Sequence, residues 1–315
     1  MPRNQSDPPD PFAAPVKVAR AAIYDDEVPA EVPRDRWRRP LILQPDDSLA
    51  PYARVSTACG ALDSGHGLGI WKLRHAALSI ARHEDIAAMV AGLEYGDPVL
   101  DELLEQACDR SAAMVEARHW GTAVHTFTEA GPEHPRRAFV PERMRSDVES
   151  YDHALEHAGL ELIESELFVV NERWRVAGTL DGLYLEKHSG LVIVADKKTG
   201  ALHPNALAAQ LAMYAAAQRY DPVTGARSPL HPDLDPERLL GIEIVRGEGR
   251  THLHRIDGFQ AIKLASLASR VHAVRAAERR QTFMTAWEEL PVPETGDPVL
   301  LTALQASIYA ARSPA

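Results

Sequence analysis

Two aspartates near the middle of the chain fall at facing positions of a predicted β-hairpin. The segments on either side of the polar turn Lys187–Gly190 are apolar and β-branched, and this pattern around a turn with glycine is a hairpin signal. If Glu186 pairs with Leu191, the same register sets Asp181 opposite Asp196. Facing residues have Cβ atoms about 4.5–5.5 Å apart, and like charges there are destabilising. A divalent metal ion between the two carboxylates would remove that repulsion.

Lys198 adds a positive charge to the face that carries Asp196, because side chains alternate along a strand. The preceding residues Leu191–Ala195 are apolar on both faces, which is typical of an interior strand. Charged groups at the end of such a strand need charged partners or a metal. Carboxylates and the backbone carbonyl of Lys197 offer the oxygen ligands that Mg²⁺ and Mn²⁺ favour. A metal-activated water and a lysine that stabilises negative charge would suit hydrolysis of a phosphodiester bond.

A structural ion pair explains the same residues without a metal. A shifted turn would place Asp181 opposite Lys198 and neutralise both side chains. Because structural ion pairs also cluster charged residues, the spacing alone leaves both interpretations open.

Three motifs occur in order: Gly178-x-x-Asp181, then Asp196-x-Lys198-Thr199-Gly200, then Gln210-x-x-x-Tyr214. Their order and spacing resemble the PD-(D/E)XK nuclease superfamily, in particular its RecB-type and phage-type exonucleases. The resemblance covers about residues 116–220. It implies that Asp181 and Asp196 bind the metal and that Lys198 is catalytic. It also implies supporting or DNA-contacting roles for Thr199, Gln210 and Tyr214.

The same resemblance extends to a helix that precedes the strands. Gly121-x-x-x-His125 matches a family pattern in which the histidine is a metal ligand. Glu129 follows four residues later on the same helical face, and Glu166 opens the first strand; both are weaker ligand candidates. The apolar stripe of this helix lies on a different side from His125, so the resemblance and not the periodicity supports that residue.

The element order predicts an α/β protein with a restriction-endonuclease-like core, in which helices flank a mixed central sheet, and with a helical N-terminal region. We expect an extended Pro-rich arm over 1–50, helices over 51–110, the nuclease core over 111–290 and a tail over 291–315. Within the core, helices are expected at 112–130, 142–158, 204–220 and 258–285, and strands at 161–170, 174–186, 191–198, 240–246 and 251–256.

Composition excludes several classes of protein. The net charge of −11 provides no global basic field, so any DNA site must be local or depend on metal. The two cysteines are too few for a four-cysteine iron–sulfur cluster, and a reducing cytoplasm is the expected location. The chain has no P-loop for ATP and no apolar run for a membrane span or signal peptide.

Two other sequence patterns could indicate functional sites. His153-x-x-Glu156-His157 spells a zinc-protease signature, but its histidines lie nearly opposite the apolar stripe of their helix and are expected to face water. Basic residues gather in two groups that could form a local DNA-binding groove or simply face solvent: Arg246, Arg250, His252, His254 and Arg255, and then Arg270, Arg275, Arg279 and Arg280.

The sequence therefore predicts a deoxyribonuclease that uses Mg²⁺ or Mn²⁺, most simply an exonuclease acting on the ends of linear DNA. A structure-specific endonuclease on the same fold, or a non-catalytic protein that binds nucleic acid or a partner, are the alternatives. The sequence does not determine the oligomeric state or a protein partner.

Overall fold

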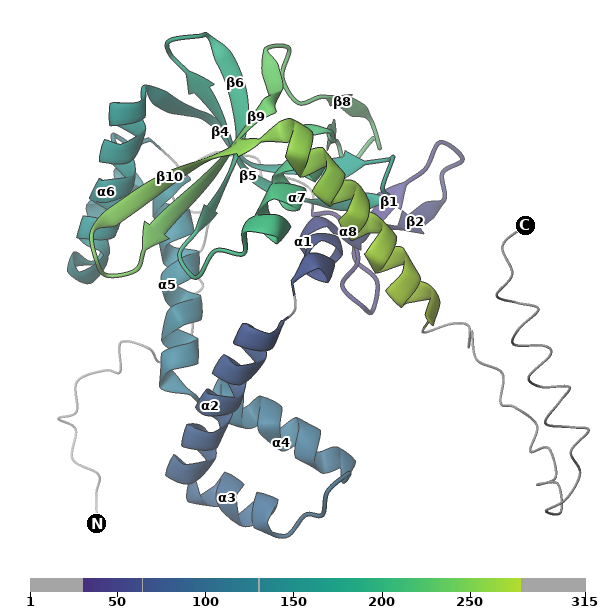
Figure 1. Cartoon of the computed structure of the whole chain (residues 1–315), viewed down its shortest axis with the longest axis vertical. Coiled ribbons are helices and arrows are strands. Elements are labelled where there is room, and N and C mark those ends of the chain that lie inside the picture. The colour runs from purple at the N-terminus through teal and green to yellow at the C-terminus, as the bar shows by residue number, and fades with distance from the viewer. Residues whose placement is uncertain (1–30, 64, 130, 279–315) are drawn as a thin grey trace, which may run out of the picture.

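The structure is a computed structural model that describes residues 31–63, 65–129 and 131–278 (Figure 1). Several sequence predictions lie outside these residues. They are the first part of the predicted arm (1–30), the end of the predicted helix 258–285 with Arg279 and Arg280, and the tail 291–315.

A mixed sheet of eight strands forms the centre of the described chain. Its order is β10-β9-β6-β5-β4-β7-β8, and β3 also pairs with β5. The strands of this sheet are β3 (Ala53–Arg54), β4 (Leu160–Asn171), β5 (Val176–Glu186), β6 (Leu191–Lys198), β7 (Gln218–Tyr220), β8 (Arg227–Pro229), β9 (Leu234–Val245) and β10 (Arg250–Asp257). Neighbouring pairs are antiparallel except for β6 with β9 and β3 with β5, which are parallel.

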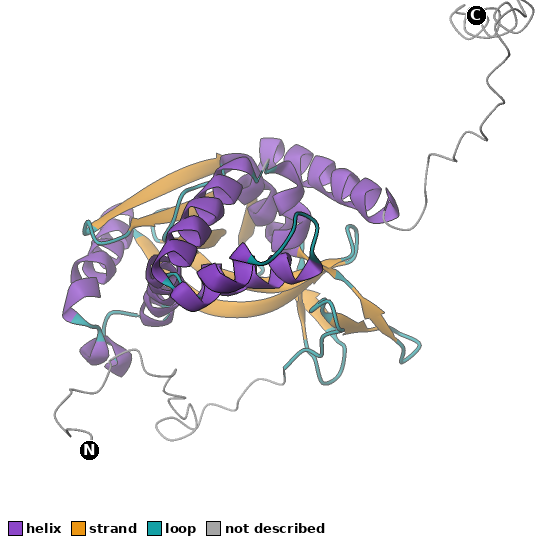
Figure 2. Cartoon of the chain, turned by 90° about the horizontal axis from the view of Figure 1, so that it is seen from below, coloured by secondary structure: helices purple, strands orange, loops and turns teal. Residues whose placement is uncertain are grey.

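Helices cover both faces of this sheet (Figures 1 and 2). The helices are α1 (Val55–Cys59), α2 (His66–Arg82), α3 (Glu84–Ala91), α4 (Pro98–Asp109), α5 (Ala112–Thr128), α6 (Glu142–Ala158), α7 (Pro204–Ala215) and α8 (Gly258–Glu278), with short 3₁₀ turns η2 (Gly60–Leu62) and η3 (Pro135–Phe139). Side chains from α1, α7 and α8 form the core on one face, and side chains from α5 and α6 form the core on the other. The prediction of an α/β fold with a mixed sheet between helices is confirmed.

Strand β6 is the interior strand that its sequence indicates. Val192 and Val194 pack into the core under α7, whereas Ile193 and Ala195 pack into the core under α6. Because all four are apolar, the strand can be covered on both faces without an unpaired polar side chain.

The predicted hairpin register is confirmed from Glu186–Leu191 to Gly182–Ala195, but the facing pair Asp181–Asp196 that the same register predicted does not form. Glu186 pairs with Leu191, and the ladder continues to the pair Gly182–Ala195. Gly190 adopts φ of 72°, which suits glycine, and its N–H donates to the carbonyl of Glu186 at 2.9 Å.

After the Gly182–Ala195 pair the two strands separate, and we call this divergence the strand fork. Strand β6 continues alongside β9 as far as the pair Lys198–Glu243, whereas β5 runs on toward β3, which it meets at Val176 and Ala177. Within the described residues no strand pairs with the β6-side edge of β5 between these two ladders. Asp181 is the first residue of β5 inside the fork.

The described residues of the region 51–110 form four α-helices and the 3₁₀ turn η2. Helices α2, α3 and α4 pack together around Ala76, Ile86 and Ala107. In Figure 1, α5 runs from the sheet towards these three helices, and so it connects them to the rest of the chain.

Two segments differ from the sequence predictions. The helix predicted over 204–220 ends at Ala215, because Asn171 Nδ2 donates to the carbonyls of Met213 and Ala216, and residues Gln218–Tyr220 form β7 beside β4. Within the predicted arm, β1 (Leu41–Leu43) pairs with β2 (Leu49–Pro51), and Ile42 is buried against the sheet. Both features depend on partners that are distant in sequence.

Asp147 joins three elements and should be the most costly polar residue to remove from the α6 face. Its buried carboxylate accepts hydrogen bonds from Trp120 Nε1 at 3.0 Å and from the backbone N–H groups of Gly247 at 2.8 Å and Gly249 at 3.0 Å. Since Asp147→Ala would leave these three donors without a partner, we expect the free energy of unfolding to fall by about 3 kcal/mol. Urea denaturation measures this change. The exposed neighbour Glu149→Ala is the control, and equal small losses in both variants would contradict the role of Asp147.

Candidate metal centre

Three side chains converge where the strand fork opens. His125 of α5, Glu166 of β4 and Asp181 of β5 each offer one ligand atom, and these atoms lie within 4.8 Å of one another. In the part of the chain that the structure describes, this is the one group of three or more such side chains with that spacing. We call it the ligand trio. Two carboxylates and one imidazole form a donor set that suits Mg²⁺, Mn²⁺ or another divalent ion.

Glu166 reaches the trio through an unusual backbone conformation. Its φ is 56°, and it lies between the pairs Ser165–Gly182 and Leu167–Leu180, directly across from Asp181. The other described non-glycine residues with positive φ lie outside the strands, in turns. A left-handed conformation costs about 1–2 kcal/mol for such a residue. Local backbone strain of this kind is typical of functional sites, and here it occurs at Glu166, which supplies one of the two carboxylates of the trio.

His125 lies on a second covered side of α5, away from the apolar stripe. One turn earlier, a Cβ at Gly121 would lie only 3.0 Å from Thr199 Oγ1, so glycine permits close approach of α5 to the loop after β6. His125 Nδ1 then lies 3.8 Å from Asp181 Oδ2, and the side chain is 26% exposed. Burial lowers the pKa of His125, although the Asp181 carboxylate opposes that shift. The neutral imidazole that results is the form that binds metal ions.

Asp181 is held in the fork by the backbone of β6. Its Oδ2 accepts a hydrogen bond of 2.8 Å from the N–H of Lys197. The carboxylate therefore takes the place of a carbonyl partner that the ladder would have supplied had the strands stayed paired.

Asp196 belongs to a second half of the site, on the α7 side of β6. Its carboxylate accepts a hydrogen bond of 2.6 Å from Gln210 Nε2 and lies 2.5 Å from Lys198 Nζ. Only 1% of its side chain is exposed, whereas 38% of the Lys198 side chain is. Burial raises the pKa of Asp196 to about 7, with a further contribution from the nearby Asp181 carboxylate. The pKa of Lys198 is raised, because the two carboxylates outweigh the effect of its burial.

Gly178 and Tyr214 close the α7 side. A Cβ at position 178 would lie 3.1 Å from Tyr214 Oη, so Gly178, the glycine of the first motif, leaves room for the phenol of Tyr214. Burial and the negative charge of Asp196 raise the pKa of Tyr214 well above its usual value, which keeps the hydroxyl protonated. Gln210 and Tyr214 thus form the wall behind Asp196.

The remaining candidates take different positions. Glu129 lies just beyond α5, outside the trio, with its carboxylate 3.7 Å from Arg136. Thr199 faces Gly121. The side chain of Lys197 is fully buried on the α6 face of β6, a position that the sequence predictions did not consider. The sequence does hold a signal for this buried position. Lys197 and Lys198 are successive residues at the end of a strand that is covered on both faces, so their side chains must point to opposite faces.

The rival motif lies apart from the ligand trio, and most of the first basic group lies beside acidic side chains. His153 and His157 are exposed on α6 and do not take part in the trio. Four of the five basic residues of this group have an acidic partner: Arg250 pairs with Glu248, and Arg246 lies 3.0 Å from Glu116, His254 2.9 Å from Glu243 and Arg255 3.9 Å from Glu186. These acidic partners offset part of the positive charge of the arginines.

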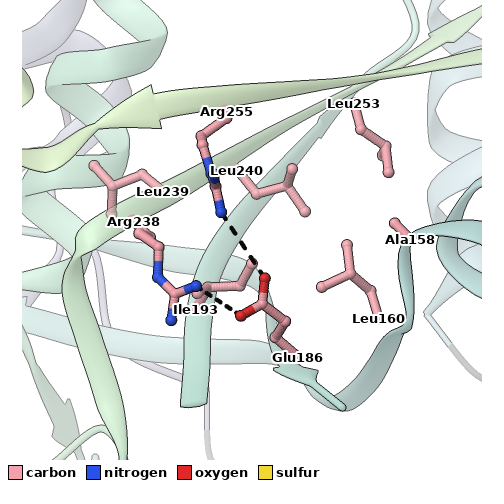
Figure 3. Close-up of a pocket in the computed structure, with 9 residues that line it drawn as sticks. All are labelled: Ala158, Leu160, Glu186, Ile193, Arg238, Leu239, Leu240, Leu253 and Arg255. Carbon is pink, nitrogen blue, oxygen red and sulfur yellow. Dashed lines mark hydrogen bonds and ion pairs between the residues drawn. The ribbon is translucent and has the colours of Figure 1, made fainter. Parts of the chain in front are cut away.

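A pocket of about 160 Å³ lies near the turn of the hairpin, between the end of α6, the end of β5 and the middle of β9 and β10 (Figure 3). Leu160, Ile193, Leu240 and Leu253 line it, and Arg238 and Arg255 both point toward Glu186 at its rim. Glu186 is five positions after Asp181 along β5, a distance of about 17 Å along a strand. The pocket is therefore separate from the ligand trio.

Comparison with known proteins adds no family assignment, since no protein-family model and no curated protein matches this chain. Within the described residues, no helix combines the length and the apolar composition that crossing a membrane requires. The interpretation of the site therefore depends on its geometry and chemistry.

Asp196 should make the metal-free protein less stable as pH rises. Its pKa of about 7 in the folded chain exceeds the usual 3.8, so between these values the folded state holds a proton that the unfolded state has lost. In EDTA, the free energy of unfolding of the wild type should therefore decrease from pH 5 to pH 8 relative to that of Asp196→Asn. His125 has a lowered pKa and acts in the opposite direction, but it is present in both proteins. Urea denaturation at both pH values gives the comparison, and parallel pH profiles would contradict the assignment.

Proposed function

We propose that this chain is a metal-dependent deoxyribonuclease that hydrolyses phosphodiester bonds, acting from the ends of linear DNA. The observation that carries the proposal is the pairing of two elements at one strand fork. The ligand trio includes Asp181, which accepts a hydrogen bond from the N–H of Lys197. The residues on either side of Lys197 in β6, Asp196 and Lys198, form the ion pair.

The trio would hold the metal. His125, Glu166 and Asp181 come from three different elements, so the folded chain has already positioned them before a metal binds. A bound Mg²⁺ or Mn²⁺ would lower the pKa of a coordinated water and shield the charge of a phosphate. Glu166 is exposed, which leaves that side of the trio accessible to a substrate.

Lys198 would act on the phosphate. Its ammonium is half-buried, and Asp196 fixes its position from one side. The raised pKa of Lys198 keeps the ammonium charged at neutral pH. A fixed positive charge beside the reacting phosphate stabilises the negative charge that grows in the transition state. Gln210 and Tyr214 support this arrangement through Asp196 rather than through direct contact with DNA.

The motif order and the topology support a place in the PD-(D/E)XK superfamily with a restriction-endonuclease-like core. The D-x-K strand is β6, it pairs antiparallel with the strand of the first motif, and the Q-x-x-x-Y helix α7 follows it. The Gly121–His125 spacing also gains a physical reason, since Gly121 faces Thr199 and His125 faces Asp181.

Replacement of the proposed catalytic lysine should abolish cleavage. With Mg²⁺ or Mn²⁺, the wild type should degrade linear DNA and leave covalently closed circles intact, and EDTA should stop the reaction. We expect Lys198→Ala to lower the rate by about 100-fold or more, since it removes a charge that stabilises the transition state. The exposed Lys263→Ala is the matched control. Nicking of closed circles would favour an endonuclease, and an active Lys198→Ala variant would contradict the mechanism.

Metal binding should stabilise the fold through the trio. At 100 times its dissociation constant, a bound ion adds about 2.7 kcal/mol to the free energy of unfolding. The wild type should therefore melt at a higher temperature with Mn²⁺ than with EDTA, and Asp181→Asn and His125→Ala should lose this increase. His153→Ala, which changes the rival zinc motif, should keep it. A wild type whose melting temperature does not respond to Mn²⁺ would count against the metal centre.

A further inference from the structure

A short loop before β1 carries an exposed tryptophan among arginines. Residues 34–39, which we call the arginine loop, consist of four arginines, one aspartate and Trp37, on a chain whose net charge is −11. Trp37 is 60% exposed. Among the residues that the structure describes, no carboxylate forms an ion pair with Arg34, Arg36 or Arg38. The loop is therefore a local positive site on an acidic protein.

Asp35 fixes the conformation of the arginine loop from within. Its Oδ1 accepts hydrogen bonds from the N–H of Trp37 at 3.0 Å and from the N–H of Arg39 at 2.8 Å, and its Oδ2 pairs with the Arg39 guanidinium at 2.7 Å. The N–H of Arg38 donates to the carbonyl of Asp35 at 2.8 Å, and Arg38 has a φ of 61°, which is strained for a residue with a side chain. Asp35 thus neutralises Arg39, and the other arginines of the loop remain for an external anion.

The Trp37 ring and the Arg36 guanidinium are stacked at the tip of the loop. The Cζ of Arg36 lies 3.9 Å from the ring centroid, and the Cζ of Arg39 lies 4.9 Å from it. A cation–π contact at an exposed site is weak, so a phosphate that accepts charge-assisted hydrogen bonds can draw Arg36 from the ring. The ring that this movement uncovers is a platform on which an unpaired base can stack.

The arginine loop is anchored on the face of the sheet that carries the ligand trio. Val32, before the loop, and Ile42, after it, are buried in one cluster with Ala177 of β5. Ala177 and Asp181 are four positions apart in β5, so their side chains point to the same face, about 13 Å apart along the strand. Since a DNA strand carries a phosphate about every 3.4 Å along its axis, several nucleotides would reach from the loop to the trio.

We propose that the arginine loop binds single-stranded DNA, with its arginines on phosphates and Trp37 against an unpaired base, and that it guides a strand end to the ligand trio. The inference deepens the proposed function, on which it rests for the identity of the partner, because it names a single-stranded end as the form of DNA that the site receives. An acidic peptide would offer the arginines negative charge but would not offer Trp37 a flat base.

Fluorescence anisotropy of a labelled single-stranded oligonucleotide tests the inference on the full chain, in EDTA so that no cleavage occurs. Trp37→Ala should weaken binding by about tenfold, because it removes a stacking platform, and Trp37→Phe, which keeps a ring, should weaken it less. Phe259→Ala is the matched control and should bind as the wild type does. Phe259 is also 60% exposed, but it lies on α8, over the opposite face of the sheet. Absence of binding by the wild type, or equal affinities of Trp37→Ala and Phe259→Ala, would overturn the proposal.

Salt dependence tests the arginines. Each phosphate contact with a single strand contributes about 0.7 to the slope of log affinity against log salt concentration. Arg36→Ala should lower the slope by about this amount, and Lys263→Ala, which removes an exposed charge on α8, should leave it unchanged. An unchanged slope in Arg36→Ala, or equal affinity of the wild type for polyglutamate, would overturn the proposal.

Cleavage assays separate this inference from the proposed function. If the loop variants weaken DNA binding as expected but the wild type cleaves no DNA in Mg²⁺ or Mn²⁺, only the proposed function is contradicted. If the wild type cleaves linear DNA and Trp37→Ala binds and cleaves equally well, only the role of the arginine loop is contradicted.

Discussion

The strand fork between β5 and β6 is the feature on which the rest of the site depends. Paired strands satisfy their backbone groups with each other, so a site inside a sheet must open where the pairing stops. Here it stops after Gly182–Ala195, and the N–H of Lys197 donates to the Asp181 carboxylate at 2.8 Å instead of to a carbonyl. That single bond fixes a candidate metal ligand to the strand that carries Asp196 and Lys198.

Burial explains how these charges are distributed. Because β6 is covered on both faces, each charged side chain at its end must be balanced on the face to which it points. On the α7 face, Asp196 is balanced by Lys198 and hydrogen-bonded to Gln210. On the other face, Lys197 is buried near the Tyr151 ring, and burial lowers its pKa against the opposing effect of the Asp181 carboxylate. The strand thus separates a group suited to bind metal from a group suited to stabilise a phosphate.

Much of the fold could be predicted because local patterns specify it. The hairpin register follows from a short turn between two apolar segments, and α6 begins and ends where its periodicity and Gly159 indicate. The end of α7 could not be predicted, since Asn171, far away in sequence, supplies the hydrogen bonds that terminate it. The hairpin of β1 and β2 likewise depends on burial of Ile42 against the sheet.

The sequence alone indicated which residues are candidates for chemistry, because motif spacing and strand alternation predict which charged side chains gather at one strand end. It identified Asp181, Asp196 and Lys198, and through a family resemblance His125. Only the tertiary structure decided that Asp181 lies beside His125, whereas Asp196 lies beside Lys198. In the folded chain, the side of α5 that carries His125 is covered, and Glu166 lies across from Asp181 in a left-handed conformation. Asp196 accepts a hydrogen bond from Gln210 instead. These contacts join elements that are distant in sequence, and no local pattern records the packing that brings them together.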